Sequence, residues 1–243
     1  MLTIPGKHAV FLLVHACIAA SSYGAVDRET CMEALGIPAG DCDALVALYI
    51  STNGASWSNT ENWGTTNAPW SGVNAADGRV AEISLPSNSL TGPLPAELGN
   101  LSRLDFLYLS GNQLTGPLPA ELGQLSRLEY LNLSYSKLTG PLPAGLGNLS
   151  KLEYLNLANN DLTGPLPAEL GNLSSLEYFD FSNNDLAGPL PTELGNLSNL
   201  ENLNLSYNHL VADADGNILI PGEIQKWHES LVNSDISNQM LAP

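Results

Sequence analysis

The chain has 243 residues, of which 44% are hydrophobic and only 14% are charged, and its formal net charge is −17. This composition is that of a folded chain and excludes general disorder. An acidic surface repels nucleic acid and anionic membranes, so we expect neither as a partner. It favours cationic partners, metal ions or neutral glycans, although solubility alone would account for the charge equally well.

Residues 1–24 read as a secretion signal. A basic residue precedes an apolar run over residues 9–20, and small residues follow that run. Cleavage after Gly24 places small residues at the −3 and −1 positions, and cleavage after Ser22 fits nearly as well. We therefore expect the mature protein to be secreted, periplasmic or held at the cell surface.

The same apolar run is too short to anchor the chain by itself. It falls well below the roughly 20 residues that a membrane-spanning helix needs. A lipid-modified Cys17 is the less favoured alternative, because His15 interrupts the apolar stretch before it. We expect no membrane insertion.

Residues 25–79 do not repeat and predict an N-terminal cap. Cys31 and Cys42 remain after processing, and one disulfide between them would staple this cap. Two separate buried thiols are the alternative. Because the CxxC spacing is absent, redox chemistry is not expected.

The cap also contains a predicted helix and a cluster of tryptophans. Asp41 or Asp43 is placed to cap a helix through the segment ALVALYIST, and Gly54 follows its end. Three tryptophans come next, among small polar residues: Trp57, Trp63 and Trp70. We interpret them as the core of the cap, covering the open end of the structure. Platforms for sugar rings are the alternative.

From residue 94 to residue 213 the chain repeats itself every 24 residues, and a degenerate unit begins at residue 80. A unit this short cannot bury its own leucines, so the units must stack into a solenoid. We assign residues 80–210, about six coils, to this repeat domain. Alternating leucines predict parallel strands centred on residues 83–85, 107–109, 131–133, 155–157, 179–181 and 203–205.

A polar residue closes the apolar motif of each unit. An amide at this position can satisfy backbone groups where the chain turns, which predicts a ladder that ties one coil to the next. The ladder consists of Asn88, Asn112, Asn160, Asn184 and Asn208. Ser136 replaces the amide in one unit, where we expect a local weakness or a bridging water.

Residues 211–243 depart from the repeat and predict a C-terminal cap. The segment VADADGNILIP suggests a hairpin turning at Asp215–Gly216, and Pro221 opens a short amphipathic helix. Trp227 and Leu231 of that helix would pack on the last coil. The DADGN segment lacks the glycine and glutamate offsets of an EF-hand, so we read it as a turn and predict no metal site.

The repeat reads LxxLxxLxLxxNxLxGPLPxxLGNL and resembles the plant-specific leucine-rich repeat of receptor-kinase ectodomains and polygalacturonase-inhibiting proteins. The segment DCDALVALYISTNGASWSNTENW, followed by PWSGV, resembles the N-terminal cap of that family, closest to its secreted bacterial and protist versions. The resemblance spans about residues 29–213. It implies an α/β solenoid with a parallel sheet on its concave side, a helical N-terminal cap and, here, a hairpin-helix C-terminal cap. It indicates little about function, because relatives bind proteins, peptides, hormones and glycans.

Two columns of side chains between the leucines would face outwards on the concave sheet. The candidate ligand-binding residues in these columns are Phe106, Tyr108, Tyr130, Asn132, Tyr154, Asn156, Tyr178, Asp180, Asn202 and Asn204, and the columns begin at Glu82 and Ser84. Aromatic faces beside amides suit neutral sugars, and surfaces rich in tyrosine and asparagine also suit protein partners. The alternative is that these residues are only cross-strand ladders, copied by duplication of the repeat.

A third column carries an acid in every full unit: Asp105, Glu129, Glu153, Glu177 and Glu201. Stacked like charges repel by roughly 1 kcal/mol per pair in water. Arg103, Arg127 and Lys151 lie two positions earlier and are predicted to pair with the first three acids, whereas the last two units have Ser175 and Asn199 there. Glu177, Asp185 and Glu201, with Asp180, would then form an unbalanced acidic patch for a cationic partner or a metal ion.

The sequence contains no nucleophile elbow, zinc-protease, P-loop or dinucleotide-binding pattern. Repeated carboxylates also lack the unlike environments that separate a catalytic acid from a base. We therefore predict no enzyme and no cofactor. The expected function is a binding module that recognises a protein or carbohydrate ligand through the concave sheet. A structural or adhesion spacer is the alternative, and glycosidase and ice-binding functions are less favoured.

Overall fold

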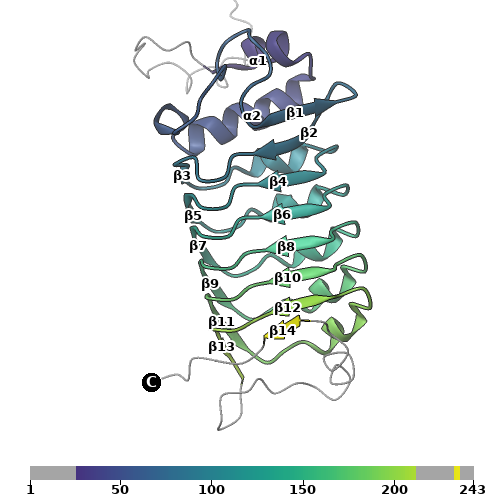
Figure 1. Ribbon diagram of the computed structural model, residues 1–243. Coiled ribbons are helices and arrows are strands. Elements are labelled where there is room, and N and C mark those ends of the chain that lie inside the picture. Colours follow the sequence, from purple (N-terminus) through teal and green to yellow (C-terminus); the bar gives the residue numbers. More distant parts are fainter. Residues whose placement is uncertain (1–25, 212–232, 236–243) are drawn as a thin grey trace, which may run out of the picture.

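The computed structural model describes residues 26–211 and 233–235, which form a stack of coils beneath a helical cap (Figure 1). The predicted signal segment, and the hairpin and helix predicted after residue 211, lie outside the described residues. Within the described part no single helix is long and apolar enough to span a membrane. Only α1 and α2 taken together pass that test, and they are bent by 118° at their junction.

The cap is built from two helices, a 3-10 turn and an antiparallel ribbon of two strands. These elements are α1 (Arg28–Leu35), α2 (Ala39–Ser51), η1 (Gly54–Ser56), β1 (Val73–Ala76) and β2 (Arg79–Ser84). The disulfide between Cys31 and Cys42 joins the two helices, as predicted, with their Cα atoms 5.7 Å apart. Trp57, Trp63 and Trp70 are buried in one aromatic cluster with Tyr49, which confirms that they form the core of the cap.

The predicted helix cap at Asp41 or Asp43 is wrong. Helix α2 begins at Ala39 after Pro38, and no side chain caps it. Asp41 lies in the first turn, fully buried, and its carboxylate accepts hydrogen bonds from the Arg79 guanidinium (Nη2–Oδ1 2.6 Å) and from the backbone N–H of Val80 (2.9 Å). The carboxylate therefore joins the cap helix to β2, because a buried charge is stable only when it is paired.

One face of the stack is a sheet that grows by one strand per coil, and its strands run parallel from β2 onwards. The sheet contains, in order, β1, β2, β4 (Phe106–Tyr108), β6 (Tyr130–Asn132), β8 (Tyr154–Asn156), β10 (Tyr178–Asp180), β12 (Asn202–Asn204) and β14 (Asn233–Asp235). The short strands β4 to β12 are centred one residue earlier than the sequence predicts, and the solenoid itself is confirmed. Strand β14, which pairs in parallel with β12, follows the predicted C-terminal helix and was not predicted.

A second sheet runs along another side of the stack (Figure 1). Its strands are β3 (Thr91–Gly92), β5 (Gln113–Gly116), β7 (Lys137–Gly140), β9 (Asp161–Gly164), β11 (Asp185–Gly188) and β13 (His209–Leu210). A 3-10 turn completes each coil, in the positions η2 (Ala96–Asn100), η3 (Ala120–Gln124), η4 (Ala144–Asn148), η5 (Ala168–Asn172) and η6 (Thr192–Asn196). The leucines of all three sides meet in one continuous core.

The asparagine ladder is present between the coils. From Asn112 onwards, each ladder amide nitrogen donates to a carbonyl of its own coil and to one of the preceding coil, as Asn160 does to Leu157 O (3.0 Å) and Leu133 O (3.1 Å). Its Oδ1 accepts from the N–H of Leu138 at 3.0 Å. At the interrupted step the Ser136 hydroxyl is buried and has no hydrogen-bond partner among the described residues, so the ladder is broken there. The local weakness or bridging water expected at this step stays a prediction.

Candidate functional site: the strand face

The outward side chains of β2, β4, β6, β8, β10 and β12 form one continuous surface, which we call the strand face. Its strands pair in register, so Glu82, Phe106, Tyr130, Tyr154, Tyr178 and Asn202 make one row and Ser84, Tyr108, Asn132, Asn156, Asp180 and Asn204 make the other. The residue between the two rows on each strand, such as Leu131 or Phe179, is fully buried. Strand alternation therefore leaves the candidate residues on one side of the sheet.

The aromatic row is a stack of rings. The ring centroids are 5.1 Å apart for Phe106 and Tyr130, 5.9 Å for Tyr130 and Tyr154, and 4.4 Å for Tyr154 and Tyr178. The last pair is almost parallel, with an interplanar angle of 7°. Tyr130 and Tyr154 thus have a ring against each face, and they present their edges and hydroxyl groups outwards.

Side chains of the second row also accept hydrogen bonds from serines of their own coil. Asn132 Oδ1 accepts from the N–H and the hydroxyl of Ser134 (3.1 and 2.7 Å), and Asn204 does the same with Ser206. Asp180 accepts from both groups of Ser182 at 2.9 and 2.7 Å. One oxygen of each side chain is therefore occupied within its own coil.

Burial raises the pKa of three phenol groups on the strand face. Desolvation raises the pKa of Tyr178, and the negative charge of Asp180 adds to the rise. The Tyr178 hydroxyl donates to Asp180 Oδ2 at 3.3 Å. Desolvation also raises the pKa of Tyr130 and of Tyr108, with further contributions from Glu153 and Tyr130 respectively. The face accordingly presents hydroxyl donors at neutral pH.

None of the three ion pairs predicted within a coil is present among the described residues. Arg127 binds Asp105 of the preceding coil, with Nε 3.0 Å from Oδ1. Arg103 and Lys151 form no ion pair with any described residue, so their predicted pairing is wrong. The Arg127 side chain can reach the acid of the preceding coil because that coil is only one strand spacing away, about 4.8 Å.

The acidic patch predicted from the sequence is divided between two sheets. Glu177 and Glu201 are exposed and immediately precede β10 and β12 of the main sheet. Asp185 lies on β11 in the second sheet, where its carboxylate is 3.4 Å from Nε2 of His209. Among residues 26–211 and 233–235, no three His, Cys, Asp or Glu side chains are grouped as metal ligands.

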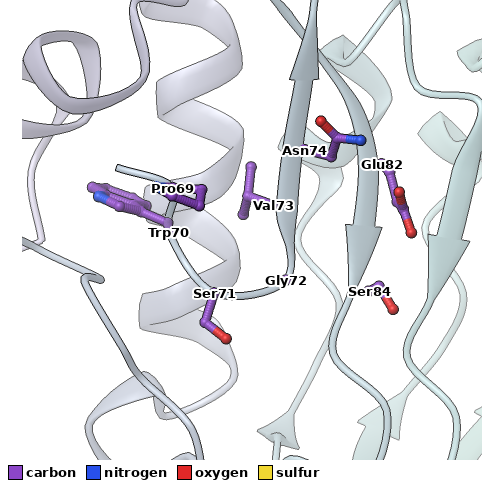
Figure 2. A pocket seen from close by; sticks show the side chains of 8 residues that line it. All are labelled: Pro69, Trp70, Ser71, Gly72, Val73, Asn74, Glu82 and Ser84. Carbon is purple, nitrogen blue, oxygen red and sulfur yellow. The ribbon is translucent and has the colours of Figure 1, made fainter. Parts of the chain in front are cut away.

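A shallow depression of about 250 Å³ lies at the N-terminal end of the strand face. It extends over the β1–β2 ribbon from Pro69 and Val73, on the side of the cap, to Glu82 and Ser84, on the side of β4 (Figure 2). Trp70, Ser71, Gly72 and Asn74 complete its lining. Glu82 is the charged residue of this set, and it is the register partner of Phe106, the first ring of the stack.

The sequence matches the family model described as leucine-rich repeat region over residues 84–230, more than half of the chain. This chain is a leucine-rich repeat protein.

The leucine-rich repeat protein is similar to ectodomains of plant receptors. The Arabidopsis receptor kinase HAESA ectodomain, solved with an N-terminal extended IDA peptide hormone ligand, superposes with a TM-score of 0.71 at 28% identity, over 86% of this chain and 34% of that chain. The PEPR1–AtPEP1 structure superposes with a TM-score of 0.68 at 25% identity, over 83% of this chain and 32% of that chain. A chain of the BIR3–SERK2 complex from Arabidopsis thaliana superposes with a TM-score of 0.58 at 30% identity, over 70% of this chain and 95% of that chain.

The leucine-rich repeat protein spans 23%, 32% and 25% of the chains in the RGFR1, PEPR1 and GASSHO1/SCHENGEN3 structures, respectively.

One feature of the site and one feature of the cap were not evident from the sequence. The depression needs β1 to fold back beside β2, and the Asp41–Arg79 pair joins residues 38 positions apart. No repeat pattern signals either one.

Proposed function

We propose that this chain is a secreted, non-catalytic binding module that holds an extracellular ligand on the strand face. The observation that carries the proposal is the unbroken row of stacked rings from Phe106 to Tyr178, flanked by amides and by protonated phenols. The similarity to receptor ectodomains solved with peptide hormones supports an extracellular location and a polypeptide ligand. The repeated carboxylates have similar surroundings, which favours binding over acid–base catalysis.

The ring geometry favours a protein or peptide over a glycan. Sugars stack on aromatic faces, and the faces of Tyr130 and Tyr154 are covered by neighbouring rings. Ring edges and hydroxyl groups instead give polar and apolar contact at low cost in side-chain entropy, as in antibody combining sites. A glycan ligand stays the second candidate, because amides of the neighbouring row can bind hydroxyl groups.

An array of extracellular proteins, peptides and glycans tests the proposal. The triple variant Tyr130→Ala, Tyr154→Ala, Tyr178→Ala should lose at least about tenfold in capture, because these rings form the centre of the proposed contact. The matched control is Tyr135→Ala with Tyr207→Ala, which removes two exposed tyrosines from turns outside the two rows. Melting curves show whether each variant is folded. Capture that survives in a folded triple variant would contradict the proposal and favour a spacer.

Charge gives a second measurement on the same array. Exposed Glu177 and Glu201 favour a ligand with positive charge. Capture should therefore weaken as ionic strength rises from about 0.05 M to about 0.5 M, since screening lengths shorten over that range. Capture that does not change with salt would contradict a cationic ligand while leaving the strand face as the binding surface.

A further inference from the structure

We propose that the depression over the β1–β2 ribbon is a subsite for a basic side chain, arginine or lysine, of the polypeptide that the strand face binds. This inference rests on the proposed function and specifies the chemistry at one end of the site. It has three supports on the molecule: the shape of the depression, an unpaired carboxylate and an adjoining aromatic ring.

The lining is arranged in the way that a long basic side chain requires. Pro69 and Val73 supply apolar wall on the cap side, and Asn74, Ser84 and Glu82 supply polar groups on the ribbon (Figure 2). Lysine and arginine bury their methylene stems against apolar surface and extend the charged head to a polar group. The methylene stem of a bound arginine or lysine would therefore lie against the apolar lining, and its charged head group would lie at Glu82.

The Glu82 carboxylate is available for such a head group. No hydrogen bond or ion pair reaches it from any residue that the structure describes, unlike Asp41 and Asp105, which are each bound to an arginine. Asn74 is its register partner on β1 and is exposed beside it. A half-buried carboxylate in a depression attracts a cation more strongly than a carboxylate on open surface, because less water screens it.

The adjoining ring adds a second attraction for a cation. Phe106 pairs in register with Glu82, and the rings of Tyr130 and Tyr108 lie 5.1 and 6.2 Å from the Phe106 ring, centroid to centroid. A cation held by Glu82 would thus lie near an aromatic ring, and such contacts are favourable, particularly for arginine. The negative charge of Glu82 also contributes to the raised pKa of Tyr108, whose largest cause is burial, so the carboxylate lies close to the ring rows.

The test uses the whole chain and two small probes of similar shape, of which only the first has a cationic guanidinium; the second has a neutral ureido group. Nα-acetyl-arginine amide and its citrulline analogue are titrated into ¹⁵N-labelled protein, and backbone amide shifts are followed at Gly72, Asn74 and Ser84. We expect saturable shifts with the arginine probe and about two- to fivefold weaker binding of the citrulline probe, as for a partly exposed charge pair. Glu82→Gln should abolish that difference.

Glu169→Gln is the matched control, because it removes an exposed carboxylate on η5, outside the strand face. It should leave the binding of both probes unchanged. Equal shifts with the two probes, no shifts at these amides, or an arginine response that persists in Glu82→Gln would each overturn the subsite. A melting curve identical to that of the wild type verifies the fold of each variant.

The two proposals fail in different ways. If the tyrosine variant loses array capture but Glu82→Gln affects neither capture nor probe binding, the subsite is wrong and the strand face stands. If the arginine probe binds through Glu82 but the array shows no capture, the basic subsite stands and the proposed function is wrong.

Discussion

At the scale of single residues, buried polar side chains hold neighbouring coils together because each bonds backbone groups of two coils. Asn184 donates to Leu157 O and Phe181 O, and Asn160 also donates to Leu157 O. One carbonyl thus accepts from two ladder amides, which its two lone pairs allow. Ser136 is too short to make the same bonds, and its buried hydroxyl finds no partner among the described residues.

Restoring the amide at this step should stabilise the protein. In Ser136→Asn, the new side chain should donate to Leu109 O and Leu133 O, the equivalents of the carbonyls bonded by Asn160. We expect the free energy of unfolding to rise by about 1–2 kcal/mol, the value of one or two net hydrogen bonds. Urea unfolding measures it.

The Ser136→Ala variant separates the effect of removing the unpaired hydroxyl from the effect of adding an amide. It removes the unpaired hydroxyl without adding an amide, so it should change stability by less than about 1 kcal/mol. If the asparagine variant is no more stable than the alanine variant, the ladder does not extend through this coil.

At the scale of elements, the 3-10 turns approach one another so closely that a glycine is required at each contact. A Cβ placed on Gly147 would lie 2.2 Å from the backbone oxygen of Glu169 in the next coil. The equivalent positions Gly99 and Gly171 meet the same obstacle. The G of the LGN motif is therefore a packing requirement between η4 and η5, and its backbone needs no unusual φ angle.

Gly147→Ala should accordingly destabilise the stack, by about 3 kcal/mol, because two backbones would have to separate. Gly145→Ala is the matched control two residues earlier on η4. There the added Cβ meets its nearest neighbour, Ala120 O, at 3.3 Å, and other coils carry glutamate at this position. Its effect should stay within about 1 kcal/mol. Thermal unfolding of the pair measures the difference, and equal losses would contradict the packing argument.

At the scale of the whole molecule, each coil contacts only its neighbours, so stability is a sum of local terms along the stack. The cap covers the first coil, where α2 packs on η2 and buries Leu45 and Leu48. The disulfide constrains this end, and the parallel pairing of β14 with β12 adds a strand at the other. Weakening one end should therefore loosen the coils near it and leave distant coils unchanged.

Removing the disulfide tests this linear arrangement. In the Cys31→Ala, Cys42→Ala double variant, the cap should lose about 3 kcal/mol, as expected for a loop of this order. Hydrogen exchange at the amides of α1 and α2 should accelerate, while exchange at β8 and β10 stays at the wild-type rate. Faster exchange at every coil to the same extent would show that the stack unfolds as one unit.

The repeat itself determined the solenoid, the strand positions to within one residue, the asparagine ladder and the two outward rows. It could do so because a 24-residue period fixes which side chains lie side by side, whatever the details of the coil. The disulfide and the tryptophan core of the cap were also predictable, since paired cysteines and clustered aromatics point to few alternatives in a short segment.

Tertiary structure alone decided the contacts that cross between segments. Asp41 resembles a helix cap in the sequence, yet it bonds to Arg79 because the ribbon brings that guanidinium over the first turn of α2. Arg127 selects the acid of the preceding coil, and Asp185 belongs to the second sheet. The depression at Glu82 exists only where β1 folds back on β2. A period specifies which neighbours are equivalent, but the distance and direction between unlike segments depend on how their backbones pack.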